Sequence, residues 1–186
     1  MIKNQPSDEE IVASVVKGEV DLYGELMSRY EQKLLRYVIY LARDQIVAAD
    51  VVQDTFIKAY QNLRGFNDKY KFSSWIYRIA HNETMNAIKR EKHLNFDVDV
   101  ETLEDDKEPN IISDIDKSIM KRKLSGCMEK LKPKYREVLM LQYFENMKYS
   151  EIADILHIPI STVGVRSARA KDAIKQICIE KGVKYE

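Results

Sequence analysis

Cationic and amide side chains recur at helical spacing in two parts of this chain. In residues 160–175, the outward positions of a predicted helix are Thr162, Val165, Arg166, Arg169 and Lys171. Guanidinium and ammonium groups in such a row can contact phosphates or reach guanine edges from a major groove. The pattern predicts a DNA-reading helix, although a compact helical hairpin with a solvated basic face would show the same spacing.

A helix-turn-helix is the element that would position this row. Apolar residues mark one face of a short helix before Pro159, and a second apolar stripe follows it. The stripes consist of Ile152, Ile155 and Leu156, then Val163, Ala170, Ile174 and Ile177. Because proline restricts the preceding residue to extended conformations and suits a first helical turn, Pro159 separates two helices within 148–175.

A second row of polar residues follows an aromatic loop. The loop at 64–72 contains three aromatic residues and three cations, and the predicted helix after it, capped by Ser73 or Ser74, carries an outward stripe. The candidate DNA-binding residues are Lys69, Tyr70, Phe72, Arg78, Asn82, Asn86, Lys89 and Arg90. An unpaired base can stack on an aromatic ring for about 1 to 3 kcal/mol while cations hold its phosphates. We expect Phe66 in the core, and Tyr70 and Phe72 divided between core and base stacking.

The predicted helix at 47–63 has one apolar and one polar face. Val52, Phe56, Ala59 and Leu63 recur at helical spacing and should be buried. The outward residues include Asp50, Gln53, Asp54 and Lys58. Such a face is usually solvated, and these residues alone do not identify it as a docking surface.

Composition and the distribution of charge indicate the fold class and the division of the chain into segments. The 186 residues include 30 basic and 30 acidic side chains, with six Gly and four Pro, which favours helices. Residues 96–117 carry 2 basic and 9 acidic side chains, whereas 118–186 carry 14 and 8, so the last segment suits an anionic partner. We therefore predict an all-α fold with an N-terminal helical bundle (1–95), a flexible acidic linker (96–117) and a C-terminal helix-turn-helix domain (118–186).

Neither an enzyme nor a membrane protein is indicated by the motifs. The sequence has no signal peptide and no apolar run near the ~18 residues that span a bilayer, so we expect a cytoplasmic protein. Nucleotide-binding, zinc and nucleophile motifs are absent, which predicts no cofactor, no metal, no small-molecule substrate and no catalytic residue. Cys127 and Cys178 lack a CxxC neighbour, and we expect buried thiols rather than a disulfide or a metal pair.

Taken together, these stretches resemble the sigma-70 family of RNA polymerase sigma factors, of the extracytoplasmic-function type, over nearly the full length. The resemblance rests on AADVVQDTFIKAYQNL (48–63), FSSWIYRIAHNETMNAIKRE (72–91), LKPKYREVLMLQYFENMKYSEIADIL (131–156) and IPISTVGVRSARA (158–170). It implies core RNA polymerase binding through Asp50, Gln53, Asp54 and Lys58, opening of the −10 element by residues 64–91, and −35 recognition by 160–175. It also implies an anti-sigma factor, often membrane-tethered.

Three positions depart from the pattern of the family. Gly164 and Val165 stand where cationic or polar residues are common, and Ser167 stands where a large apolar residue is common. These departures bear on the −35 sequence and on the strength of its readout. Two alternative functions follow: an autonomous helix-turn-helix regulator, which would usually need a dimer on paired half-sites, and a protein-binding regulator that retains the sigma fold.

Overall fold

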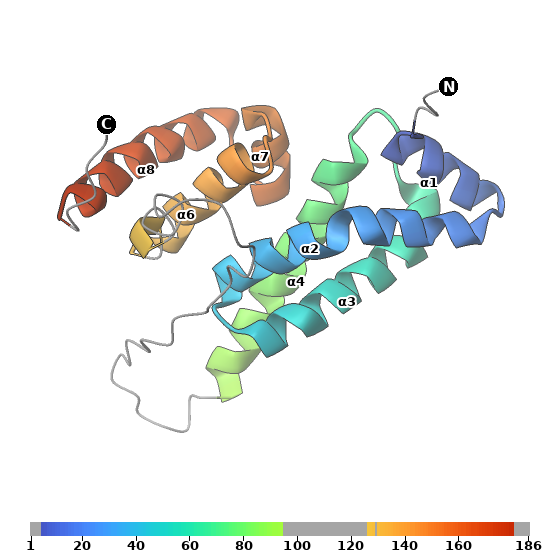
Figure 1. Cartoon of the computed structure of the whole chain (residues 1–186), viewed down its shortest axis with the longest axis horizontal. Coiled ribbons are helices and arrows are strands. Elements are labelled where there is room, and N and C mark those ends of the chain that lie inside the picture. The colour runs from blue at the N-terminus through green and yellow to red at the C-terminus, as the bar shows by residue number, and fades with distance from the viewer. Residues whose placement is uncertain (1–4, 95–125, 129, 181–186) are drawn as a thin grey trace. The chain divides into compact units, whose positions relative to one another are not determined.

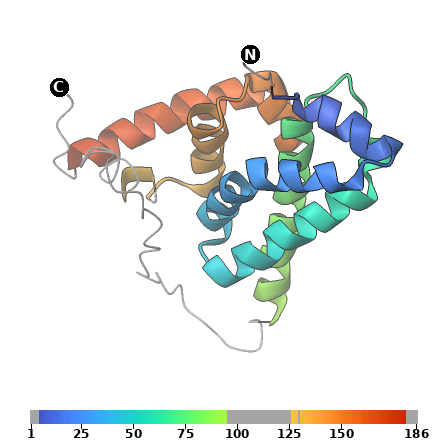
Figure 2. The same cartoon turned by 45° about the vertical axis from the view of Figure 1, so that its right-hand side comes forward.

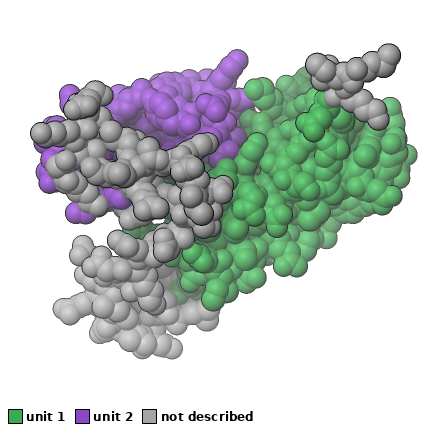
Figure 3. All heavy atoms as spheres, in the orientation of Figure 1, with its two compact units in different colours: residues 1–105 green, residues 106–186 purple. Residues whose placement is uncertain are grey.

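The computed structural model describes residues 5–94, 126–128 and 130–180, and every regular element in these ranges is helical (Figure 1). The chain divides into two compact units, residues 1–105 and 106–186 (Figure 3). The predicted all-α fold of two helical domains is confirmed. The predicted linker at 96–117 lies outside the described residues, so the boundaries at 95 and 118 stay predictions.

The first unit is a bundle of four α-helices. These are α1 (Asp8–Lys17), α2 (Tyr23–Ala42), α3 (Gln45–Gln61) and α4 (Phe72–Leu94), with short 3₁₀ turns at Val20–Leu22 and Leu63–Gly65. Figures 1 and 2 both show α2, α3 and α4 side by side. Buried side chains from all three helices fill the space between them, so the exposed faces of α3 and α4 are held on a packed core.

Local signals begin and end these helices. Ser7 forms a capping box with Glu10: the Glu10 N–H donates to Ser7 Oγ at 3.2 Å, and the Ser7 N–H donates to Glu10 Oε2 at 2.7 Å. Helix α1 ends at Gly18, whose φ of 117° is a conformation that L side chains rarely adopt. Asp44 begins α3 by accepting hydrogen bonds from the Ile46 and Val47 N–H groups.

The start of α4 lies in an aromatic cluster. Phe72 is 0% exposed, and its ring centroid lies 5.5 Å from that of Tyr30, 5.9 Å from that of Phe66 and 5.7 Å from that of Trp75. The cluster joins α2, the loop at 66–71 and α4. Aromatic rings contribute large buried areas and prefer such tilted contacts, so this cluster fixes where the loop meets α4.

The second unit is the predicted helix-turn-helix with a supporting helix. Its elements are α6 (Pro133–Leu139), a π-helical turn (Met140–Phe144), α7 (Tyr149–Leu156) and α8 (Ile160–Glu180). Helix α7 ends at Leu156. The next residue, His157, has a left-handed φ of 51°, and α8 begins at Ile160, directly after Pro159. The break predicted from Pro159 is therefore confirmed.

The cysteine prediction was wrong in one respect. Cys127 and Cys178 are both fully buried, as expected, but the structure joins them in a disulfide with a Cα–Cα distance of 5.7 Å. Ile174 and Ile177 pack against the pair. The apolar spacing around Cys178 correctly indicated burial, but it carries no information about a partner 51 residues away in sequence.

Reduction of this disulfide should destabilise the C-terminal unit. A cross-link over a separation of 51 residues lowers the conformational entropy of the unfolded chain. In the chain-entropy model this raises the free energy of unfolding by about 4 kcal/mol. Protein prepared without reductant should therefore unfold at a higher temperature than the same protein in dithiothreitol, as measured by calorimetry. A Cys127→Ala, Cys178→Ala double variant should be insensitive to reductant. Two free thiols in denatured, unreduced protein would contradict the pairing.

Candidate nucleic-acid interface

Helix α8 carries the predicted −35 residues on its surface. Val165, Arg169 and Lys171 are exposed, and Thr162 and Arg166 are partly exposed. The opposite face is buried through Val163, Ser167 and Ala170. The Lys171 ammonium lies 5.6 Å from the centroid of the Tyr143 ring. Hydrogen bonding with the Tyr143 side chain raises the pKa of Lys171 above its ordinary value.

Ser167 is buried in α8, and its hydroxyl makes hydrogen bonds with two neighbouring side chains. Its hydroxyl receives a hydrogen bond from the Tyr149 hydroxyl at 3.1 Å and donates one to Gln142 Oε1 at 2.6 Å. These bonds join the π-helical turn, α7 and α8. A buried hydroxyl is costly unless it is paired, and here both neighbours supply a partner. Ser167 therefore connects α8 to α7 and to the π-helical turn through hydrogen bonds.

The face of α4 is the second candidate surface. Asn82, Asn86, Lys89 and Arg90 are exposed, and Arg78 is partly exposed. Glu83 follows Asn82 in the sequence, but it is only 8% exposed. Its Oε2 accepts a 2.5 Å hydrogen bond from the Lys58 ammonium of α3. The carboxylate nearest the middle of the stripe is thus paired inside the bundle, and the exposed face keeps amides and cations.

A pocket of ≈ 400 Å³ lies between the end of α3 and the start of α4. Its lining residues are Lys58, Asn62, Gly65, Trp75, Ile79, Asn82 and Glu83. Trp75 supplies an aromatic ring that is half-buried against Phe66, with the ring centroids 5.3 Å apart. Amide groups of Asn62 and Asn82 supply donors and acceptors. An aromatic ring beside amide groups is the combination that binds an unpaired base.

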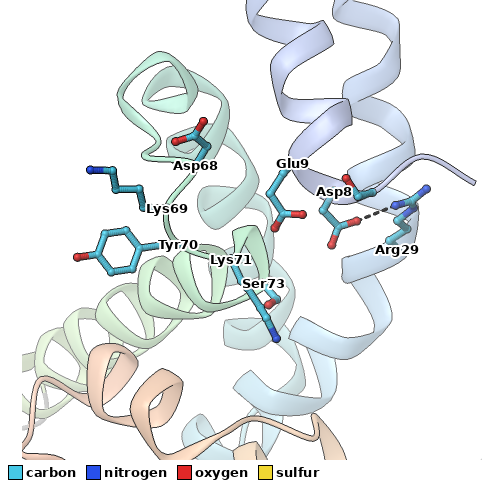
Figure 4. A pocket seen from close by; sticks show the side chains of 9 residues that line it. Asp8, Glu9, Arg29, Asp68, Lys69, Tyr70, Lys71 and Ser73 are labelled. Carbon is cyan, nitrogen blue, oxygen red and sulfur yellow. Dashed lines mark hydrogen bonds and ion pairs between the residues drawn. The ribbon is translucent and has the colours of Figure 1, made fainter.

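The three aromatic side chains of the loop at 64–72 differ in how far they are exposed. Tyr70 is 58% exposed, whereas Phe72 is 0% exposed and belongs to the core, so the assignment of Phe72 as a DNA-contacting residue was wrong. Phe66 is partly buried against Phe72 and Trp75. Tyr70 and Lys69 line another pocket, of ≈ 450 Å³, together with Asp8, Glu9 and Arg29 of α1 and α2 (Figure 4).

The polar face of α3 is exposed as predicted. Asp50, Gln53, Asp54 and Lys58 all lie on the surface, opposite the buried Val52, Phe56 and Ala59. Lys58 also donates a hydrogen bond to Glu83 and lines the pocket, so it belongs both to this face of α3 and to the pocket. Sequence reasoning missed three exposed apolar side chains on α3, Ile46, Ile57 and Tyr60, at 77%, 46% and 43% exposure. Ile57 falls outside the buried stripe in the sequence, and this is the signal that could have identified it.

The structure gives no sign of a metal centre in the residues that it describes. Among them, no three His, Cys, Asp or Glu side chains are grouped so as to hold a metal ion. In the same residues, no helix is long and apolar enough to cross a membrane. The candidate surfaces in the described residues are the basic face of α8, the stripe of amides and cations on α4 beside the pocket, and the face of α3 that carries Asp50 and Asp54.

These features define a two-domain helical DNA-binding protein, and comparison with known proteins identifies its family. Residues 26–94 match the Sigma-70 region 2 family and residues 121–174 match the Sigma-70, region 4 family. The ECF RNA polymerase sigma factor SigW of Bacillus subtilis is 30% identical over 174 residues, covering 89% of this chain and 93% of that protein. The ECF RNA polymerase sigma-E factor of Escherichia coli is 30% identical over 183 residues, covering 93% and 95%. This chain belongs to the sigma-70 family of RNA polymerase sigma factors, of the extracytoplasmic-function type.

Solved structures agree on the fold. The structure of CnrH in complex with the cytosolic domain of CnrY has a TM-score of 0.68 and 22% identity, and the match covers 92% of this chain and 97% of that one. The sigma factor RpoE in complex with the anti-sigma factor NepR from Bartonella quintana has a TM-score of 0.69 and 20% identity, with 83% and 95% covered. Sigma factors are DNA-binding transcription initiation factors, so the two candidate DNA surfaces lie in a protein that binds DNA.

Gly164→Ala should stabilise the C-terminal unit without a steric cost. A Cβ at this position would meet only Tyr149 Cε2, at an ordinary contact distance of 3.7 Å. Alanine is better than glycine inside a helix by up to ~1 kcal/mol, which corresponds to roughly 4 to 8 °C in the melting temperature of a small domain. Gly18→Ala is the matched control and should destabilise the N-terminal unit, because its φ is 117°. A lower melting temperature for Gly164→Ala would show that the glycine is required.

Proposed function

We propose that this chain directs core RNA polymerase to its promoters through three surfaces. The polar face of α3, with Asp50, Gln53, Asp54 and Lys58, binds core polymerase. The stripe on α4 binds the −10 strand, and the exposed face of α8 reads the −35 element. The three surfaces are exposed, while the residues opposite them are buried. The role is that of a specificity subunit acting in the cytoplasm, where the template DNA lies, and it requires no catalytic residue.

The pocket beside Asn82 is the observation that carries this proposal. Promoter opening leaves bases of one strand unpaired, and a protein captures that state by holding a base outside the stack. Trp75 offers a ring face, and Asn62 and Asn82 offer hydrogen-bonding edges around one pocket. The cations Lys89 and Arg90 continue along α4 from this pocket and can follow the phosphates. An autonomous helix-turn-helix regulator would have no use for this arrangement.

An anti-sigma factor is the second partner that we propose. CnrH and RpoE, which share this fold, form complexes with the cytosolic domain of CnrY and with the anti-sigma factor NepR. A regulator of this chain would have to cover one or more of its polymerase-binding and DNA-binding surfaces. The partner in the CnrH structure is the cytosolic domain of CnrY, and this supports a membrane-tethered anti-sigma factor for this chain.

Asn82→Ala should impair promoter opening while leaving closed-complex formation unchanged. Loss of the amide removes hydrogen bonds to an unpaired base, roughly 1 to 3 kcal/mol if that base is specifically read. Permanganate footprinting on duplex DNA and transcription from a pre-melted bubble measure the two steps. Gln61→Ala, which removes an exposed amide on α3 outside the pocket, is the control. Wild-type footprints and base discrimination in Asn82→Ala would remove this residue from the base site.

Asp54→Lys should weaken binding to core polymerase by at least roughly tenfold, or about 1.4 kcal/mol. Reversing an exposed charge changes folding stability by only ~0.5 kcal/mol, so the loss would come from the interface. Glu19→Lys, which makes the same change at an exposed site in the turn after α1, should bind normally. A titration of labelled core polymerase measures both. Equal affinities for Asp54→Lys and the wild type would exclude this face of α3 as the docking surface.

A further inference from the structure

A residue of α1 holds the point where the loop at 66–71 joins α4. The Glu9 Oε1 atom accepts a 2.9 Å hydrogen bond from the backbone N–H of Phe72, across 63 residues of sequence. Phe72 is the first residue of α4, so its N–H has no partner within the helix. A carboxylate at this end of a helix also gains from the helix dipole.

Neither serine predicted to cap α4 stands at this position. The sequence pointed to Ser73 or Ser74, but α4 begins at Phe72 and both serines lie inside the first turn. The acceptor at the Phe72 N–H therefore comes from another helix. Since the Phe72 ring is also fully buried, this residue is fixed both through its backbone and through its side chain.

The first turn of α1, which contains Glu9, is itself attached to α2 by hydrogen bonds. The neighbouring Asp8 accepts a 2.7 Å hydrogen bond from Arg29 Nη1 and another from the Tyr30 hydroxyl, both on α2. Arg29 also donates to the Pro6 carbonyl at 2.9 Å. Figure 4 shows the ion pair of Asp8 and Arg29 beside Glu9. Glu9 thus transmits the position of the α1–α2 pair to the start of α4.

Both ends of this loop border the proposed base pocket. Gly65 precedes the loop, and Trp75 lies in the first turn of α4, where its N–H donates to the Lys71 carbonyl at 3.2 Å. A shift of the α4 start would move the Trp75 ring away from Asn62 and Gly65. Within the loop, the Asn67 side chain accepts a hydrogen bond from the Lys69 N–H, and its carbonyl accepts one from the Tyr70 N–H. These bonds shape the loop but do not attach it to α1.

We propose that Glu9 is a positioning residue for −10 strand capture: it holds the α4 start so that the pocket is formed before DNA arrives. This inference rests on the proposed function of the pocket. A preformed site avoids the cost of ordering the loop during binding. Glu9 does not line the base pocket, so it acts through Phe72 and Trp75 and not by contacting the base.

Three variants separate this role from general weakening of α1. Glu9→Ala removes the bond to Phe72 and keeps the capping box of Ser7 and Glu10. Glu10→Ala removes half of that box and keeps the bond to Phe72. Glu9→Gln keeps a carbonyl acceptor at the same place. Hydrogen exchange of the full chain should be faster in peptides covering 66–75 for Glu9→Ala, and unchanged there for Glu10→Ala and Glu9→Gln.

The functional test uses holoenzyme and a promoter duplex selected by the wild-type holoenzyme from a randomised library. Glu9→Ala should open this duplex about tenfold less well by permanganate reactivity, as expected for a lost bond to a charged group. Discrimination between the −10 non-template strand and the same strand with an abasic site at the captured base should decline in parallel. Glu9→Gln, which keeps a neutral acceptor, should restore most of both, while core polymerase affinity stays at the wild-type value in every variant.

Three results would overturn the inference in distinguishable ways. If Asn82→Ala is defective while Glu9→Ala opens and discriminates normally, the pocket stands and Glu9 has no positioning role. If Asn82→Ala is itself normal, the base pocket is misplaced, and the proposed function fails together with the role of Glu9. Unchanged exchange at 66–75 in Glu9→Ala would show that the hydrogen bond does not hold the loop.

Discussion

Burial of the Phe72 ring is the constraint on which the N-terminal unit depends. The ring meets Tyr30 of α2, Phe66 of the preceding loop and Trp75 of α4, and none of its surface is exposed. Because interiors are close-packed, the start of α4 cannot shift without disturbing all three neighbours. Along the rest of α4, Ile76, Ala80 and Ala87 face the core, and Asn82 lies on the far side of the helix, where it is exposed.

Helical periodicity carried most of the fold that the sequence could predict. On α3, Val52, Phe56 and Ala59 are buried and Asp50 and Asp54 are exposed, since one repeat determines both faces. The same holds on α8 for Val163 and Ala170. Backbone restriction at Pro159 placed the break in the helix-turn-helix. These signals are local, and each can be recognised within a few turns of chain.

Features that depend on tertiary pairing could not be predicted in this way. Tyr70 and Phe72 lie two residues apart in a loop without periodicity, so nothing local shows which ring turns inward. The Lys58–Glu83 pair and the Cys127–Cys178 bond join residues whose separation in sequence carries no signal. In the sequence, Glu9 is one of three consecutive acidic residues in the first turn of α1, and only the folded chain brings it to the α4 start.

The Cys127–Cys178 bond also changes the covalent topology of the C-terminal unit. All of α6 and α7, and α8 as far as Cys178, lie inside one closed covalent ring. The ring closes only in an oxidising environment, because thiols are kept reduced in most cytoplasms. When it is closed, a single protease cut anywhere between the two cysteines leaves the fragments joined. Such a nicked chain keeps both halves of its helix-turn-helix in one covalent molecule, so they can reassociate without diffusing apart.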